Sequence, residues 1–168
     1  MKKRWILLTA LMMAIGLTAC SGQKEAEPEK KETEEAGKEA ASNPKKAMYK
    51  FYMSLVNGIN EADADLNAYL SEEQPTAEMK TAASESASAV ASKVESLEIP
   101  TELKDQKADL EAALKDIAGS YKAKAEELKK DTPSMEAADA TFTQGEEKLG
   151  TAFESIDMKK PSLAKEVN

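Results

Sequence analysis

The sequence predicts an all-α protein whose folded part is an antiparallel, up-down-up-down four-helix bundle. Alanine, glutamate and lysine dominate a composition in which charged residues make up 32% and aromatic residues only 5%, a balance that favours helices. Within residues 44–160, apolar side chains recur at spacings of three and four along four stretches, as on one face of a helix. Short segments that contain proline separate these stretches, and short connections join antiparallel neighbours in bundles.

The first predicted helix covers about residues 45–71. Asn43 is a suitable N-cap, and Pro44 suits the first helical position. Asn57-Gly58 can signal a turn, but the apolar phase continues past it, so we expect one continuous helix. Its stripe consists of Met48, Tyr52, Leu55, Ile59, Ala62, Leu66 and Tyr69.

The second predicted helix covers about residues 76–97 and has a thin stripe made largely of small residues. The stripe consists of Met79, Ala83, Ser86, Val90, Val94 and Leu97. Pro100 ends this helix, because the residue before a proline resists the α conformation. Such a weak apolar face leaves an alternative open, in which a helical hairpin completes its core by dimerising.

The third and fourth predicted helices cover about residues 101–130 and 133–159. Thr101 is a candidate cap for the third helix, and Thr132-Pro133 is a start signal for the fourth. Pro161 ends the fourth helix, and we expect residues 161–168 to form a frayed tail.

The first 19 residues predict a targeting segment. Lys2, Lys3 and Arg4 precede an uncharged, mostly apolar run from Trp5 to Ala19. This run is shorter than the roughly 20 residues that span a bilayer. A basic start, a short apolar run and small residues before a cut point are typical of a secretory signal peptide.

Leu17-Thr18-Ala19-Cys20 resembles the lipobox of bacterial lipoproteins. This resemblance implies cleavage before Cys20, lipidation of the Cys20 thiol and acylation of the new amino terminus. It further implies a protein anchored in the cell membrane on its extracytoplasmic face, or in the outer membrane if the cell has one. Two buried acyl chains anchor a protein stably where one does not.

Residues 20–43 predict a disordered, charged linker behind the lipidated cysteine. From Ser21 to Asn43 there is no Val, Ile, Leu, Met or aromatic residue. Such a segment cannot bury enough apolar surface to offset the entropy lost on ordering. We therefore expect the body, residues 44–160, to stand off the membrane.

The chain lacks the residues that several classes of function require. The chain has no histidine and a single cysteine, so haem, di-iron and zinc sites of the usual kinds lack the histidine or cysteine ligands that they need. Asp63-x-Asp65-x-Asn67 begins like a calcium loop, but Ala68 stands where glycine is required. No nucleophile is paired with a base in any motif we recognise. We expect no enzyme activity, no cofactor and no metal, and the net charge of −8 disfavours nucleic acid.

Helix one is apolar around more of its circumference than one core stripe requires. Aromatic residues and methionine are enriched in binding surfaces, so these residues are a candidate partner patch: Tyr49, Phe51, Tyr52, Met53 and Val56. The alternative is that this helix packs against two neighbours and buries both faces.

The stretch Ile99-Pro100-Thr101-Glu102-Leu103-Lys104, followed by Leu110, Leu114 and Tyr121, resembles small helical lipoproteins of Gram-positive bacteria. Many of these have no assigned activity. The expected function is that of a non-enzymatic binding or adaptor protein, which holds an unknown protein partner at the cell surface. The alternative is a carrier of small hydrophobic ligands in a pocket between the helices.

Overall fold

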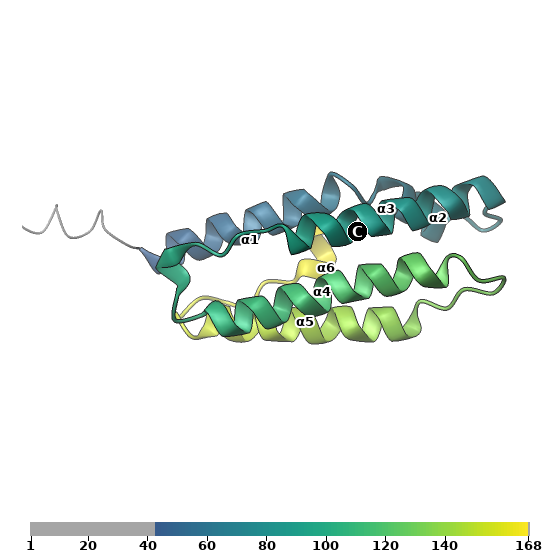
Figure 1. Ribbon diagram of the computed structural model, residues 1–168. Helices are drawn as coiled ribbons and strands as arrows, with labels where there is room; N and C mark the ends of the chain where they lie inside the picture. The colour runs from purple at the N-terminus through teal and green to yellow at the C-terminus, as the bar shows by residue number, and fades with distance from the viewer. Residues whose placement is uncertain (1–42, 168) are drawn as a thin grey trace, which may run out of the picture.

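The computed structural model describes residues 43–167, and within them the protein is all-helical. The predicted all-α class is confirmed for this part of the chain. The predicted signal peptide, Cys20 and the predicted linker up to residue 42 lie outside the described residues. Figure 1 shows the long helices lying lengthwise beside one another, with the short α6 near the middle of the molecule.

The helix α1 (Pro44–Asn60) begins as the sequence predicts. The side chain of Asn43 accepts a hydrogen bond from the amide of Lys46 at 3.1 Å, and Pro44 occupies the first turn. Met48, Leu55 and Ile59 are fully buried. Cap chemistry and apolar spacing are local features of the sequence, so both could be found without the rest of the fold.

The prediction of one continuous helix over 45–71 is wrong, because the chain breaks and restarts as α2 (Ala64–Ser71). In a continuous helix the amide of Leu66 would donate to the carbonyl oxygen of Ala62. The Ser86 hydroxyl instead stands between them, since it accepts from the Leu66 amide at 3.3 Å and donates to the Ala62 oxygen at 2.5 Å. A side chain inserted into the hydrogen-bond ladder is a known cause of a helix kink.

The helix α3 (Ala77–Glu95) follows the prediction to within two residues at its end. Thr76 caps it by accepting a hydrogen bond from the amide of Met79 at 3.2 Å. Its buried face is small, as expected, and consists of Ala83, Ser84, Ser86, Ala87, Val90, Ala91 and Val94. Small side chains let α3 pack closely against α1, α2 and α4, which it contacts.

The third predicted helix starts later than expected. Residues Thr101–Leu103 form a short 3-10 helix, η1, and the helix α4 (Lys107–Glu127) begins after a turn. Thr101 therefore does not cap the long helix, whose N-cap position is held by Gln106. Leu103 is fully buried, and η1 contacts α1. Leu103 thus enters the core from η1, before the long helix starts.

The helix α5 (Glu136–Glu154) ends five residues before the predicted boundary at 159. Asp157 takes a left-handed conformation with φ 54, and the amide of Met158 donates to the carbonyl oxygen of Phe153 at 3.1 Å. A left-handed residue with such a backward hydrogen bond closes a helix C-terminus. Aspartate tolerates this conformation better than most residues, and its sequence signal is weak.

The prediction that residues 161–168 form a frayed tail is wrong for the described part. Residues Leu163–Glu166 form the short helix α6. Leu163 is fully buried, and Val167 is 4% exposed. The side-chain amide of Asn60 donates to the carbonyl oxygen of Glu166 at 3.0 Å, and the amide of Ala164 donates to the Glu146 carboxylate at 3.2 Å. These contacts hold the tail between the end of α1 and α5.

The core lies between the long helices and includes two edge-to-face aromatic pairs. Tyr52 of α1 meets Phe153 of α5 with ring centroids 5.5 Å apart. Tyr121 of α4 meets Phe142 of α5 at 6.0 Å. Gly145 of α5 has no side chain, which leaves room for the side chain of Ile117 of α4. The backbone of α5 therefore packs directly against a side chain of α4 at this point.

Candidate functional site

An open groove of about 610 Å³ lies where α3 ends and α4 begins. Pro100 turns the chain out of α3, and the connection to α4 passes through η1. Val94 and Leu114 form a buried floor, while Leu97 and Ile99 are half-buried. The lining comprises Val94, Glu95, Leu97, Glu98, Ile99, Lys107, Glu111, Leu114 and Lys115.

The rim of this groove carries both signs of charge. Lys107 and Glu111 pair across one helical turn at 3.5 Å, and Glu95 accepts from Lys122 at 2.5 Å. The groove thus combines a small apolar floor with a polar rim, as partner-binding surfaces do. The sequence stripes had assigned Val94, Leu97 and Leu114 to the core alone. Val94 and Leu114 are buried and do belong to the core, and no pattern in the sequence indicated that a groove opens beside them.

The candidate patch on α1 is divided by the fold. Phe51, Tyr52 and Val56 are buried, at 2%, 7% and 5% exposure, so they belong to the core as the alternative interpretation expected. Met53 is half-buried against that core. Tyr49 alone of the five points outward, with 58% of its surface exposed.

Three buried polar atoms in the described core have no hydrogen-bond partner there. The hydroxyls of Tyr52 and Ser120 and one carboxylate oxygen of Asp63 are buried with no hydrogen-bond partner among the described residues. Burial raises the pKa of Tyr52 to about 12, helped by the negative charges of Glu166 and Glu146. Burial likewise raises the pKa of the Asp63 carboxyl, against a hydrogen bond from Asn67 that lowers it.

Asp63, Asp65 and Asn67 do not form a loop. Asp63 sits at the break before α2 with its side chain 5% exposed, whereas Asp65 lies exposed in the first turn of α2. Residues 43–167 contain no group of three or more acidic, histidine or cysteine side chains placed to hold a metal ion.

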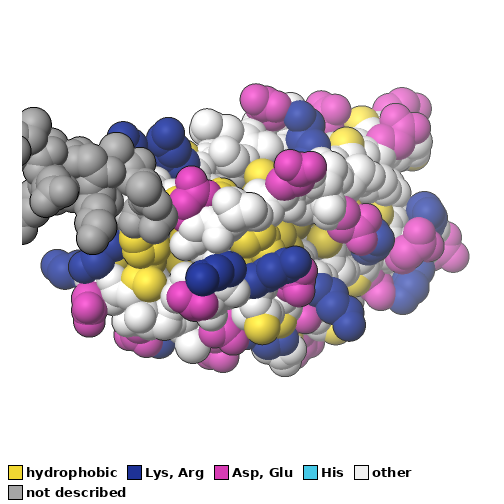
Figure 2. All heavy atoms as spheres, turned by 60° about the vertical axis from the view of Figure 1, so that its left-hand side comes forward, with side chains coloured by type: hydrophobic (Ala, Val, Ile, Leu, Met, Phe, Trp, Pro, Cys, Tyr) yellow, Lys and Arg dark blue, Asp and Glu magenta, His cyan; other side chains and the backbone are white. Residues whose placement is uncertain are grey.

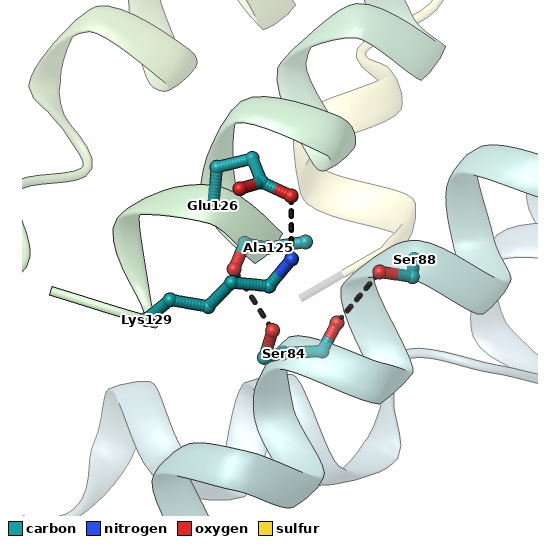
Figure 3. A network of polar contacts seen from close by, with 5 residues as sticks. All are labelled: Ser84, Ser88, Ala125, Glu126 and Lys129. Atoms are coloured by element: carbon teal, nitrogen blue, oxygen red, sulfur yellow. Dashed lines mark hydrogen bonds and ion pairs between the residues drawn. The ribbon is translucent and has the colours of Figure 1, made fainter.

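The serines of α3 tie helices together. The buried Ser84 hydroxyl donates to the carbonyl oxygen of Ala125 in α4 at 2.8 Å, and Ser88 donates to the Ser84 carbonyl oxygen at 3.0 Å (Figure 3). Beside them, Lys129 pairs with Glu126 at 2.6 Å. With no base or acid hydrogen-bonded to either serine hydroxyl, this cluster holds α3 and α4 in register and offers no activated nucleophile.

Cys20, the predicted lipidation site, lies outside the described residues, as do the predicted signal peptide and the predicted linker. Among the helices of residues 43–167, none is both long enough and apolar enough to cross a bilayer. No protein-family model matches the chain, and comparisons with curated proteins and with solved structures find no match.

Proposed function

We propose that this protein is a lipid-anchored, extracytoplasmic adaptor that binds a protein partner at the cell surface and catalyses no reaction. The observation that carries the proposal is the lipobox-like Leu17-Thr18-Ala19-Cys20 at the end of a signal-type segment. A charged linker then leads to the helical body, which begins at the Asn43 cap. An anchor, a spacer and a body with an open groove are the parts that such an adaptor requires.

We further propose that the body is an up-down-up-down antiparallel four-helix bundle, with α1 and α2 together forming the first arm. Contacts of α3 with α1 and α2, of α4 with α3 and of α5 with α4 support this arrangement. The Tyr52–Phe153 pair links the first arm to the last. Each arm thus contacts the next, and the last contacts the first. This arrangement fits a four-helix bundle better than a helical hairpin that completes its core by dimerising.

Two observations favour the adaptor over the carrier: the groove lies at the surface, and the aromatic rings of the core pack against one another. A carrier needs a pocket lined by the aromatic residues of the bundle interior. Instead Tyr52, Phe153, Tyr121 and Phe142 pack edge to face against one another. The groove beside Leu97 is at the surface and suits a short apolar segment of another protein.

The anchor is tested by Cys20→Ser in the full-length chain. We expect the parent protein to incorporate a fatty-acid label and to stay with the membrane fraction, and the variant to lose both. A variant that keeps the label and the membrane fraction would overturn the proposed anchor.

The partner is tested by placing a photo-crosslinking residue at Leu97 in the groove, with the exposed Ala140 of α5 as the matched control. Crosslinking in intact cells followed by mass spectrometry should identify the same protein repeatedly from position 97 and not from position 140. If position 97 gave only lipids, or the same proteins as position 140, the adaptor proposal would be abandoned.

A further inference from the structure

The first two turns of α1 carry an unusual charge pattern. Lys45, Lys46 and Lys50 lie in α1, which contains no acidic residue anywhere along its length. The other α-helices, α2 to α6, each carry an acidic residue in the first turn. Cations near a helix N-terminus oppose the helix macrodipole. Helix stability therefore does not account for these lysines.

Tyr49 stands among these lysines. Positions three and four apart are neighbours on a helix surface, so Tyr49 adjoins Lys45 and Lys46 on one face, and Lys50 follows one turn after Lys46. Tyr49 is 58% exposed, and among the described residues the only other exposed large hydrophobic side chain is Leu70 of α2, at 46%. We call Lys45, Lys46, Tyr49 and Lys50 the lysine–tyrosine face.

The positive charge of this face is not neutralised within the described body. No ion pair among residues 43–167 includes Lys45, Lys46 or Lys50; the Lys45 ammonium donates to a backbone oxygen, that of Asp157, at 3.3 Å. Eight lysines elsewhere in the described body pair with carboxylates, for example Lys124 with Asp139 at 2.8 Å, whereas Lys80, Lys104, Lys115, Lys159 and Lys165 do not. Figure 2 shows lysine and hydrophobic side chains beside the point where the chain enters the described body, with acidic side chains close by, on a surface that mixes both signs.

The linker alone predicts a body held off the membrane; we propose instead that the lysine–tyrosine face at the start of α1 rests on the anionic lipid surface of the membrane that holds the anchor. Lysines near a membrane are attracted to anionic headgroups, and tyrosine favours the interface because its ring is apolar and its hydroxyl polar. This inference rests on the proposed lipid anchor. Residues 21–43 connect Cys20 to the face, and a coil of that length reaches about 25–30 Å, so contact between the face and the membrane is within range.

The net charge of the chain, −8, makes this face an orienting device. An anionic surface repels most of the body and attracts the start of α1. The protein would therefore stand with α1 towards the lipid, and its acidic surfaces would be turned to solvent. The anchor fixes the protein to the membrane, whereas the face decides which side of the body the membrane meets.

The experiment uses the full-length protein, processed and purified with its anchor, in vesicles that contain nitroxide-labelled headgroups. The fluorescence of Tyr49→Trp reports whether the face meets the lipid. Leu70→Trp is the matched control, because Tyr49 and Leu70 are both large, exposed side chains. Trp5 is the only tryptophan of the chain and lies in the segment expected to be removed, and the parent protein gives its background. We expect nitroxide quenching of position 49 in vesicles that contain phosphatidylglycerol, and much weaker quenching in pure phosphatidylcholine or at position 70.

Charge reversal tests the cause of this quenching. Each lysine near an anionic surface changes the docked-to-undocked ratio by about fivefold. Lys46→Glu with Lys50→Glu in the Tyr49→Trp background should therefore lower the ratio by about twentyfold or more. Lys129→Glu with Lys130→Glu, which changes the net charge equally at exposed sites, should leave it unchanged. Concentrated salt, which shortens screening to about 3 Å at 1 M, should also abolish the difference between lipids.

The proposal is overturned if quenching at position 49 does not depend on lipid charge, or equals that at position 70. It is also overturned if the face binds a soluble polyanion while quenching stays at background on anionic vesicles. Failure of the anchor is distinguishable, because a protein without lipid does not float with phosphatidylcholine vesicles. The quenching test then continues with anionic vesicles added in excess.

Discussion

The hydroxyl of Ser86 donates to the carbonyl oxygen of Ala62 at 2.5 Å, from a helix that lies more than twenty residues further along the chain. The same hydroxyl accepts from the amide of Leu66. One serine therefore satisfies an amide and a carbonyl oxygen on the two sides of the break between α1 and α2. Because both bonds are made by one atom, the shape of the first arm depends on the packing of α3 against it.

We predict that Ser86→Ala destabilises the protein by about 1–3 kcal/mol, the cost of leaving buried backbone groups without partners. Urea unfolding followed by circular dichroism measures the change. Ser88→Ala is the control, since Ser88 is exposed and bonds only within its own helix, to the Ser84 carbonyl oxygen. Its free energy of unfolding should change by less than about 0.5 kcal/mol. Equal effects of the two substitutions would contradict the role of Ser86.

The contact between α4 and α5 yields a second prediction. A Cβ atom added at Gly145 would lie 2.8 Å from a side-chain carbon of Ile117 and 3.1 Å from the carbonyl oxygen of Ala113. Gly145→Ala should therefore destabilise by about 1–3 kcal/mol through overpacking. Gly119→Ala is matched to it, because nothing lies within 4 Å of a Cβ there, and alanine should stabilise that helix by about 0.5–1 kcal/mol. Thermal unfolding of both variants should show opposite shifts.

Features of the helices that depend only on residues close by in the sequence could be predicted. The Asn43 cap and the all-α class follow from local chemistry and apolar spacing. The break before α2 could not be predicted, because the atom that causes it belongs to Ser86. The left-handed Asp157 and the buried Leu163 likewise depend on packing, which spacing alone does not encode.

The candidate patch shows a similar limit for the site. Spacing reveals how wide the apolar arc of α1 is, but not how many neighbours cover it. Tyr52 meets Phe153, a residue far along the chain, and Phe51 and Val56 are buried with it in the core. Tyr49 is the one member of the candidate patch with most of its surface exposed. The sequence does not reveal whether the lysines around it form ion pairs. The fold shows that they have no ion-pair partner within the described body.

Two carboxyl groups close in sequence, those of Asp63 and Glu61, should change the stability of the protein in opposite directions as the pH rises. Burial raises the pKa of Asp63 above its ordinary value of 3.8. The folded state then holds this proton more tightly than the unfolded chain, so Asp63 lowers stability as pH rises through and above that value. A hydrogen bond from Lys93 at 2.7 Å lowers the pKa of Glu61. Glu61 therefore adds stability above its ordinary value of 4.5, which is lost as pH falls through its folded pKa.

Asp63→Asn should accordingly raise the free energy of unfolding near about pH 7 and have little effect near about pH 3, where the parent carboxyl is protonated in both states. Glu61→Gln should lower it near neutral pH, with a difference that vanishes in acid. Urea titrations across this range measure both slopes. If Asp63→Asn lost stability at neutral pH, burial would not dominate at that carboxyl.

The packed tail gives the last prediction. Leu163 is fully buried in α6, so Leu163→Ala removes core contacts and leaves a cavity at a cost of about 2–5 kcal/mol. Leu163→Met keeps the volume and should cost less than about 1.5 kcal/mol. Ser162→Ala, next to it and exposed, controls for the segment itself. Proteolysis should cut the Leu163→Ala variant after Lys159 or Lys165 more readily than the parent. A tail that truly frayed would show no difference among the three variants in unfolding or in cleavage, because Leu163 would then be exposed in every one of them.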